Sequence, residues 1–143
     1  MTSTTDEQEI RTLINDWVAA IHAGDLDGVV ARHAADIVMF DVPPPERGIR
    51  GLDEYRRAWP GFFDWIRSGA AFEIVELDVV AGAEVAYAIA LLRCGSPDDL
   101  DTTPDRRLRL SLGLVKGDDG WLVHHEHHSF TEVSDPSRGE DRD

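Results

Sequence analysis

The spacing of the apolar residues changes once along this chain of 143 residues, near residue 70. Before that point apolar side chains recur three and four positions apart, the period of an amphipathic helix. After it they recur at every second position, the period of a strand. Helices followed by strands predict an α+β domain, and the length predicts a single domain over residues 1–133.

Three helical segments are expected in the first half of the chain. The first begins at Thr5, which has the capping-box spacing to a glutamine, and ends at Gly24. A short second helix follows it directly. The third spans residues 52–66 and should break or kink near Trp59, because the proline that follows cannot continue a helix.

One short strand is expected in the first half of the chain and four longer strands in the second half. A short apolar run over residues 37–40 predicts a first strand that ends at Asp41, and the three prolines beyond it predict a stiff loop or an edge hairpin up to Gly51. Residues 95–105 read as a polar loop. The four longer strands are expected over residues 72–80, 84–94, 106–116 and 121–131.

The charge of the chain excludes two classes of partner. It holds 28 acidic and 14 basic residues, and this formal charge of −14 repels nucleic-acid phosphates and anionic membrane surfaces. The single cysteine, Cys94, excludes an intramolecular disulfide and fits a cytoplasmic protein, as does an N-terminus unlike a signal peptide. The polar segment 134–143 is predicted to be a disordered tail.

One predicted strand, residues 84–94, is apolar on both faces. One face carries Val85, Tyr87, Ile89 and Leu91, and the other carries Ala86, Ala88, Ala90 and Leu92. A strand with one face in water would alternate apolar and polar residues. Helices can cover one face, and we expect a second copy of the chain to cover the other, which predicts a homodimer.

Two stretches near the N-terminus resemble the opening of bacterial ketosteroid isomerases. They are DWVAAIHAGDLDGVV, residues 16–30, and DIVMFD, residues 36–41, and the register holds through residues 51–59. The segment GWLVHHEHHS, residues 120–129, is similar to other members of the same nuclear transport factor 2-like superfamily. The resemblance implies a cone-shaped, cystatin-like domain, in which three N-terminal helices pack on a curved, mainly antiparallel sheet around one pocket.

The same resemblance implies a site for proton transfer, as in isomerases and polyketide cyclases of this fold. The catalytic base of the isomerases matches Asp41. Their oxyanion tyrosine falls on Trp17, whose indole N–H donates one hydrogen bond but lacks the acidity of a phenol. Their protonated aspartate falls near Leu112, which donates nothing, so true steroid isomerase activity is not expected.

The position of Asp41 also points to a site without the resemblance. It lies where an apolar strand meets a rigid loop, so its carboxylate could project into an apolar pocket and act as a general base. The alternative is a solvated acid in a turn.

The histidines near the C-terminus supply further candidates. Strand alternation predicts that His125, His127 and Ser129 share a face with Trp121, whereas His128 lies on the opposite face. On the concave side, the first two imidazoles could act as acid, base or oxyanion donors. They could equally be hydrogen-bonded sheet histidines in a dimer interface.

A metal site is considered because residues 124–128 read HHEHH. The helical zinc signature does not match, since the segment reads as a strand. His125 and His127 supply at most two ligands, and a third would have to come from Asp41 or His33. We therefore expect neither a bound metal nor a cofactor.

The remaining candidates are ligand contacts. Arg109 could orient an anionic or carbonyl-bearing ligand, or it could pair with one of the many acids. The aromatic residues expected beside a pocket are Trp17, Phe40, Tyr55, Trp59 and Phe63. The function expected is an isomerase-like or cyclase-like enzyme for a small apolar molecule. The alternative is a non-catalytic ligand-binding or dimeric interaction module of the same fold.

Overall fold

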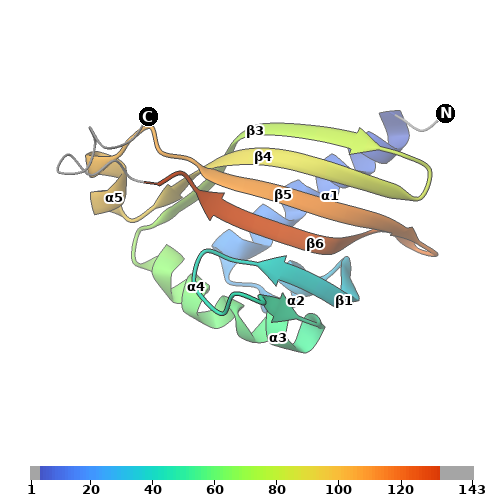
Figure 1. Ribbon diagram of the computed structural model, residues 1–143, viewed down its shortest axis with the longest axis horizontal. Helices are drawn as coiled ribbons and strands as arrows, with labels where there is room; N and C mark the ends of the chain where they lie inside the picture. Colours follow the sequence, from blue (N-terminus) through green and yellow to red (C-terminus); the bar gives the residue numbers. More distant parts are fainter. Residues whose placement is uncertain (1–3, 133–143) are drawn as a thin grey trace.

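A computed structural model describes residues 4–132 of the chain, so the predicted disorder of segment 134–143 lies outside the described residues. The strands are β1 (His33–Phe40), β2 (Ile49–Arg50), β3 (Ala71–Ala81), β4 (Val85–Gly95), β5 (Leu108–Gly117) and β6 (Gly120–Phe130). The helices are α1 (Thr4–Ala23), α2 (Leu26–Val30), α3 (Leu52–Arg57), α4 (Trp59–Arg67) and α5 (Pro97–Thr102). The α+β organisation predicted from the two apolar periods is confirmed (Figure 1).

The strands form one curved sheet in the order β2-β1-β6-β5-β4-β3. Strands β3 to β6 follow one another as antiparallel neighbours, whereas β1 runs parallel to β6. Strand β2 pairs antiparallel with β1, which confirms an edge hairpin after Asp41. This order brings the beginning of the chain beside its last strand, and the site described below lies there.

The helix boundaries follow local signals. Gly24 ends α1 with a φ of 67°, a conformation that glycine adopts without steric cost. The predicted break near Trp59 separates α3 from α4, and Pro60 is tolerated because it lies in the first turn of α4.

Segment 95–105 was expected to be a loop, and this was wrong because it contains α5. Ser96 and Asp99 form a capping box around the start of this helix, with Pro97 in its first turn.

The core lies between the helices and one face of the sheet. Helix α1 runs along this inner face, behind the long strands in Figure 1, and packs against β3. The inner face of β4 carries Ala86, Ala88, Ala90 and Leu92, all buried. They belong to the same core cluster as the large apolar residues of α1, including Ile10, Ile14, Trp17 and Ile21.

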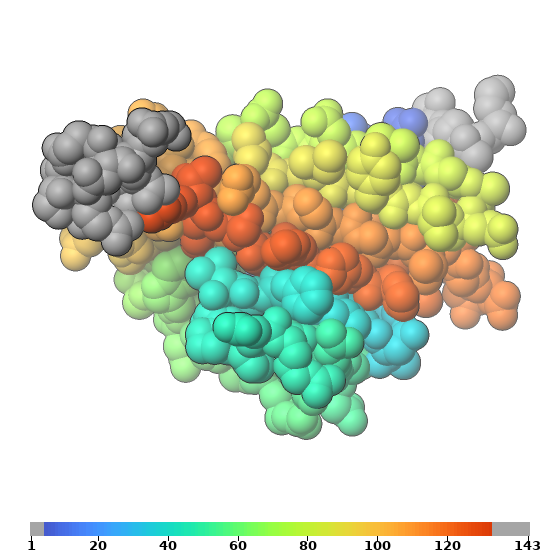
Figure 2. Space-filling model, in the orientation of Figure 1, coloured from blue at the N-terminus to red at the C-terminus, as the bar shows by residue number. Residues whose placement is uncertain are grey.

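No helix of the described residues covers the outer face of the sheet (Figure 1). In Figure 2 strands β3 to β6, coloured from yellow-green to red, reach the molecular surface. Val85, Tyr87 and Ile89 project from β4 on this face and are 64%, 49% and 47% exposed. None of the helices in the described part of the chain is long and apolar enough to cross a membrane.

This exposed apolar face supports the prediction that two copies pair through their sheets. Ile89→Asp should convert a dimer into a monomer, because burying the new carboxylate in the interface would cost more than the contact contributes. Light scattering at micromolar concentration measures this. Ser68→Asp, in the turn after α4, is the control and should remain dimeric. A wild-type protein that is monomeric would contradict the prediction.

Candidate functional site

A cavity of about 300 Å³ opens between the inner face of the sheet, helices α4 and α5, and the loop after β1. Its walls are mainly aromatic and include Trp59, Phe62, Trp65, Phe72 and Phe130. Its polar lining residues are Asp41, Cys94, Asp99, Thr103, Arg106 and His128. An apolar cavity with a few polar groups is typical of sites for small molecules, and this one is at the small end of their size range.

Asp41 lies at the mouth of this cavity. It follows the last residue of β1, and its side chain is exposed. Its Oδ1 accepts a hydrogen bond of 2.7 Å from the backbone N–H of Val42, which fixes the carboxylate against the loop. Asp41 therefore borders both the cavity and solvent.

His128, rather than His127, faces the inside of the sheet. Gly113 of β5 pairs with His125, but the next residue, Leu114, pairs with Val123, so His124 is an extra residue without a partner in β5. Such a β-bulge reverses the alternation of side chains beyond it. The prediction that His125 and His127 share a face with Trp121 is therefore wrong.

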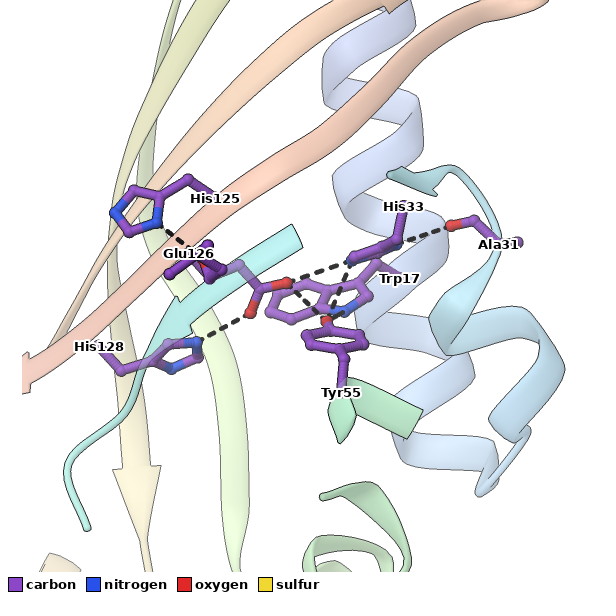
Figure 3. A network of polar contacts seen from close by, with 8 residues as sticks. Trp17, Ala31, His33, Tyr55, His125, Glu126 and His128 are labelled. Carbon is purple, nitrogen blue, oxygen red and sulfur yellow. Dashed lines mark hydrogen bonds and ion pairs between the residues drawn. The ribbon is translucent and has the colours of Figure 1, made fainter. Parts of the chain in front are cut away.

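Beyond the bulge, His125 and His127 lie on the outer face. The ring of Phe40 packs edge-on against both, with centroid distances of 5.4 and 5.7 Å. His125 Nδ1 donates to the carbonyl of Val38 at 2.7 Å. Figure 3 shows His125 leaving β6 on the side opposite to Glu126.

Several other predicted contact residues also lie outside the cavity. Arg109 is on the outer face, where it donates to Ser129 Oγ at 3.1 Å. Trp17, Tyr55 and Phe63 are buried in the core between the helices and the sheet. Trp59, another of the predicted contacts, does line the cavity.

The buried carboxylate of Glu126 organises a polar network behind the cavity (Figure 3). Its Oε1 lies 3.0 Å from His128 Nε2, and its Oε2 lies 3.2 Å from His33 Nε2. The hydroxyl of Tyr55 donates to Oε2 at 2.5 Å and accepts from Trp17 Nε1 at 3.1 Å. The network thus connects the cavity wall on β6 with α1, β1 and α3.

The environment of Glu126 keeps it ionised. Burial alone would raise its pKa, but hydrogen bonds from His128 and His33 and their charges outweigh burial and lower the pKa to about 2. Burial also favours the neutral form of His128, yet the hydrogen bond and charge of Glu126, together with the charge of Asp41, raise its pKa. His128 therefore favours the imidazolium form at the cavity wall.

Two further ionisable groups are held neutral. Burial and the charge of Glu126 raise the pKa of Tyr55 well above its ordinary value, so this hydroxyl keeps its proton. Burial and the charges of Asp41 and Asp99 raise the pKa of Cys94 to about 12. Cys94 is therefore a poor nucleophile, although it lines the cavity.

Among the described residues no three His, Cys, Asp or Glu side chains are arranged to hold a metal ion. His33 and His128 instead each form a hydrogen bond with Glu126.

The roles of Glu126 and His128 were not predicted from the sequence. A glutamate in a strand with histidines on both sides of it is only a weak signal for a buried carboxylate with imidazole partners. The bulge that turns both side chains inward has no local signal in the sequence. His33 and Tyr55 complete the network only because the fold brings β1 and α3 next to β6.

A model of the SnoaL-like domain matches residues 10–132 of the chain. No curated protein matches it. An NTF2-like protein of unknown function from Pseudomonas putida KT2440 is 32% identical, over 90% of this chain and 89% of that one, with a TM-score of 0.78.

Two more distant structures share the fold. A protein with a cystatin-like fold from Novosphingobium aromaticivorans is 16% identical over 94% of this chain and 87% of that one, with a TM-score of 0.73. A protein from Shewanella frigidimarina NCIMB 400, provisionally described as a ketosteroid isomerase, is 20% identical over 82% and 92%, with a TM-score of 0.68. At these identities the likeness concerns the fold alone.

Proposed function

The chain belongs to the SnoaL-like domain family, and on that premise we propose that it is an enzyme that moves a proton next to the carbonyl of a small, largely apolar molecule. One observation carries the proposal: Asp41 and His128 line the same aromatic cavity. The first is a carboxylate, able to accept a proton. The second is an imidazole whose raised pKa favours the form that donates one.

The proposed chemistry assigns each group a step. Asp41 removes a proton from the carbon next to the carbonyl, and the electron pair of the broken C–H bond moves toward the carbonyl oxygen. His128 Nδ1, which makes no hydrogen bond to the described residues, donates to that oxygen and stabilises its developing negative charge. Glu126 orients the imidazole through Nε2. In an isomerisation of an unsaturated ketone, the proton returns to a different carbon. In a ring closure, the enolate carbon instead attacks a second carbonyl carbon of the same molecule, and the oxygen of that carbonyl takes up the proton.

The wall composition supports an apolar substrate. Aromatic side chains surround the space between the two polar groups, so a flat ring system would replace water with favourable contacts. The description of the Shewanella protein as a provisional ketosteroid isomerase is consistent with this substrate class.

A second candidate is a pocket that binds such a molecule without chemistry. The exposure of Asp41 and its hydrogen bond to the backbone of Val42 favour it, because a solvated carboxylate is a weaker base than a desolvated one. The two candidates share the ligand class and differ only in turnover.

Binding is tested with 2-naphthol, a bicyclic compound with one hydroxyl, and with naphthalene as its apolar counterpart. We expect 2-naphthol to raise the Tm of the protein, because a ligand that binds only the folded state stabilises it. Ala58→Leu, which fills part of the cavity, should reduce the shift, whereas Ala35→Leu at an exposed position should not. No shift in the wild-type protein, or an equal shift in Ala58→Leu, would contradict the proposal.

Turnover is tested with 2-tetralone, a bicyclic ketone, through the exchange of the hydrogens beside its carbonyl with deuterium oxide. Faster exchange in the presence of the protein supports the enzyme. Binding of 2-tetralone without faster exchange supports the non-catalytic module.

A further inference from the structure

The protons in the network around Glu126 can be assigned from its hydrogen bonds. His33 Nδ1 lies 2.8 Å from the carbonyl oxygen of Ala31. A carbonyl oxygen only accepts, so Nδ1 must carry a proton. The state of the other ring nitrogen, Nε2, then depends on its neighbours.

His33 Nε2 faces two oxygen atoms. It lies 3.2 Å from Oε2 of Glu126 and 3.0 Å from the hydroxyl oxygen of Tyr55 (Figure 3). These two oxygens are 2.5 Å apart, so the single Tyr55 proton belongs between them. With that proton placed, a neutral His33 would direct its lone pair at two electron-rich oxygens. One further proton is therefore required.

That proton can reside on His33 or on Glu126. Oε1 of Glu126 accepts from His128 and Oε2 accepts from Tyr55, so both oxygens already receive a proton from a neighbour. Hydrogen bonds to a carboxylate favour its ionised form. A protonated carboxyl would lose one of these acceptor positions.

We propose that His33 is doubly protonated and forms a buried ion pair with Glu126, so that His33 acts as a positioning residue for the cavity histidine. His33 lies outside the cavity and acts only through Glu126. Its catalytic consequence rests on the proposed function, but its protonation does not.

The ion pair changes how firmly His128 holds its proton. The charged groups that raise the pKa of His128 are Glu126 on the same strand and Asp41 at the end of β1. Cys94 of β4, Asp99 of α5 and Arg106 before β5 line the same cavity. The groups that face Glu126 are His33, His128 and Tyr55. Since Glu126 shares its charge between two imidazoles, His128 is a stronger acid toward a ligand oxygen than it would be with Glu126 to itself.

The direct test is nitrogen-15 NMR of the histidine rings in the intact, ligand-free protein near pH 6.5. We expect both ring nitrogens of His33 to show the shifts and directly bonded protons of an imidazolium. A His33 Nε2 without a proton, together with a carbon-13 shift of a protonated Glu126 carboxyl, would overturn the proposal.

Two variants test the coupling to His128. His33→Gln should move the titration of His128 to higher pH, because the competing cation is lost, and Glu126→Gln should move it to lower pH. His124→Gln, at the bulge, should leave it unchanged, because His124 is half-buried and pairs with Asp36 rather than with the network. An unchanged His128 titration in a folded His33→Gln protein would contradict the coupling. Failure of 2-naphthol and 2-tetralone to bind would instead reject the proposed function and leave this result intact.

Discussion

Glu126→Gln is expected to lower the free energy of unfolding by about 3 kcal/mol, because it removes the one charge that pairs two buried imidazoles. The amide has similar size, so little of the loss comes from a cavity. It offers a single acceptor oxygen where the carboxylate has two, which leaves His33 or His128 facing a second donor. Urea unfolding followed by tryptophan fluorescence measures the difference.

Glu76→Gln is the matched control for this substitution. Glu76 lies on β3 with an exposed side chain, and its replacement should change stability by no more than about 0.5 kcal/mol. Equal stability of Glu126→Gln and the wild-type protein would show that the network contributes no net stabilisation.

The same network predicts how stability depends on pH. The folded pKa of Glu126 is lowered from 4.5 to about 2, so its stabilisation is present above pH 4.5 and is lost as the pH falls toward 2. A pKa difference of this size corresponds to about 3 kcal/mol. The pKa of His128 is raised, so its contribution is present below its ordinary value of 6.5 and is lost as the pH rises through the folded pKa.

The network should therefore stabilise the protein most between pH 4.5 and 6.5. In Glu126→Gln the decline on the acid side should be smaller and the decline on the alkaline side should disappear. A variant that keeps the wild-type profile on both sides would contradict the assignment of these groups.

The second large effect is expected at Asp41. If the chain is an enzyme, Asp41→Asn should slow the exchange of 2-tetralone hydrogens by a factor of ~10²–10⁴, because the amide cannot accept the proton. Stability should change little, since the Asp41 side chain is exposed. The exchange rate, measured by proton NMR in deuterium oxide, gives the comparison.

His128→Asn should also slow the exchange, whereas His127→Gln on the outer face should not. These expectations reverse those that strand alternation alone would give for the two histidines. Equal exchange rates for Asp41→Asn and the wild-type protein would remove Asp41 as the base and favour the non-catalytic pocket.

The order of helices and strands was predictable because it depends on local patterns. These patterns are the spacing of apolar residues, the capping residues and the prolines, and each acts over a few positions. The spacing of two located every long strand. The capping box at Ser96 is a signal of the same kind, and the helix it starts was missed because a six-residue segment with three aspartates and a proline resembles a loop.

The faces of β6 were not predictable in the same way. One extra residue, His124, reverses all side chains beyond it, and its cause is the pairing with β5 rather than any local preference. The register of β1 against β6 also shifts, between His33 and Val38. The shift between β1 and β6 depends on contacts between segments about 90 positions apart in the chain, as does the contact of Glu126 with His33.

The resemblance to ketosteroid isomerases and the strand-to-loop pattern both pointed to Asp41, which lines the cavity at the end of β1. The resemblance gave this residue the role of a base, and the pattern gave its position. The resemblance also directed attention to Trp17, which instead donates to Tyr55 in the core. The resemblance was therefore informative for Asp41, which lines the cavity, and misleading for Trp17, which does not.

We propose above that a small apolar molecule binds in the cavity lined by Asp41 and His128. Mapping of 2-naphthol binding by NMR tests it most directly, through the shifts of backbone and histidine-ring signals on addition of the ligand. We expect shifts at Met39, Phe72, Cys94 and the ring of His128, with the signals of His125 and His127 unchanged. Shifts confined to Tyr87, Ile89 and His127 on the outer face of the sheet would contradict it.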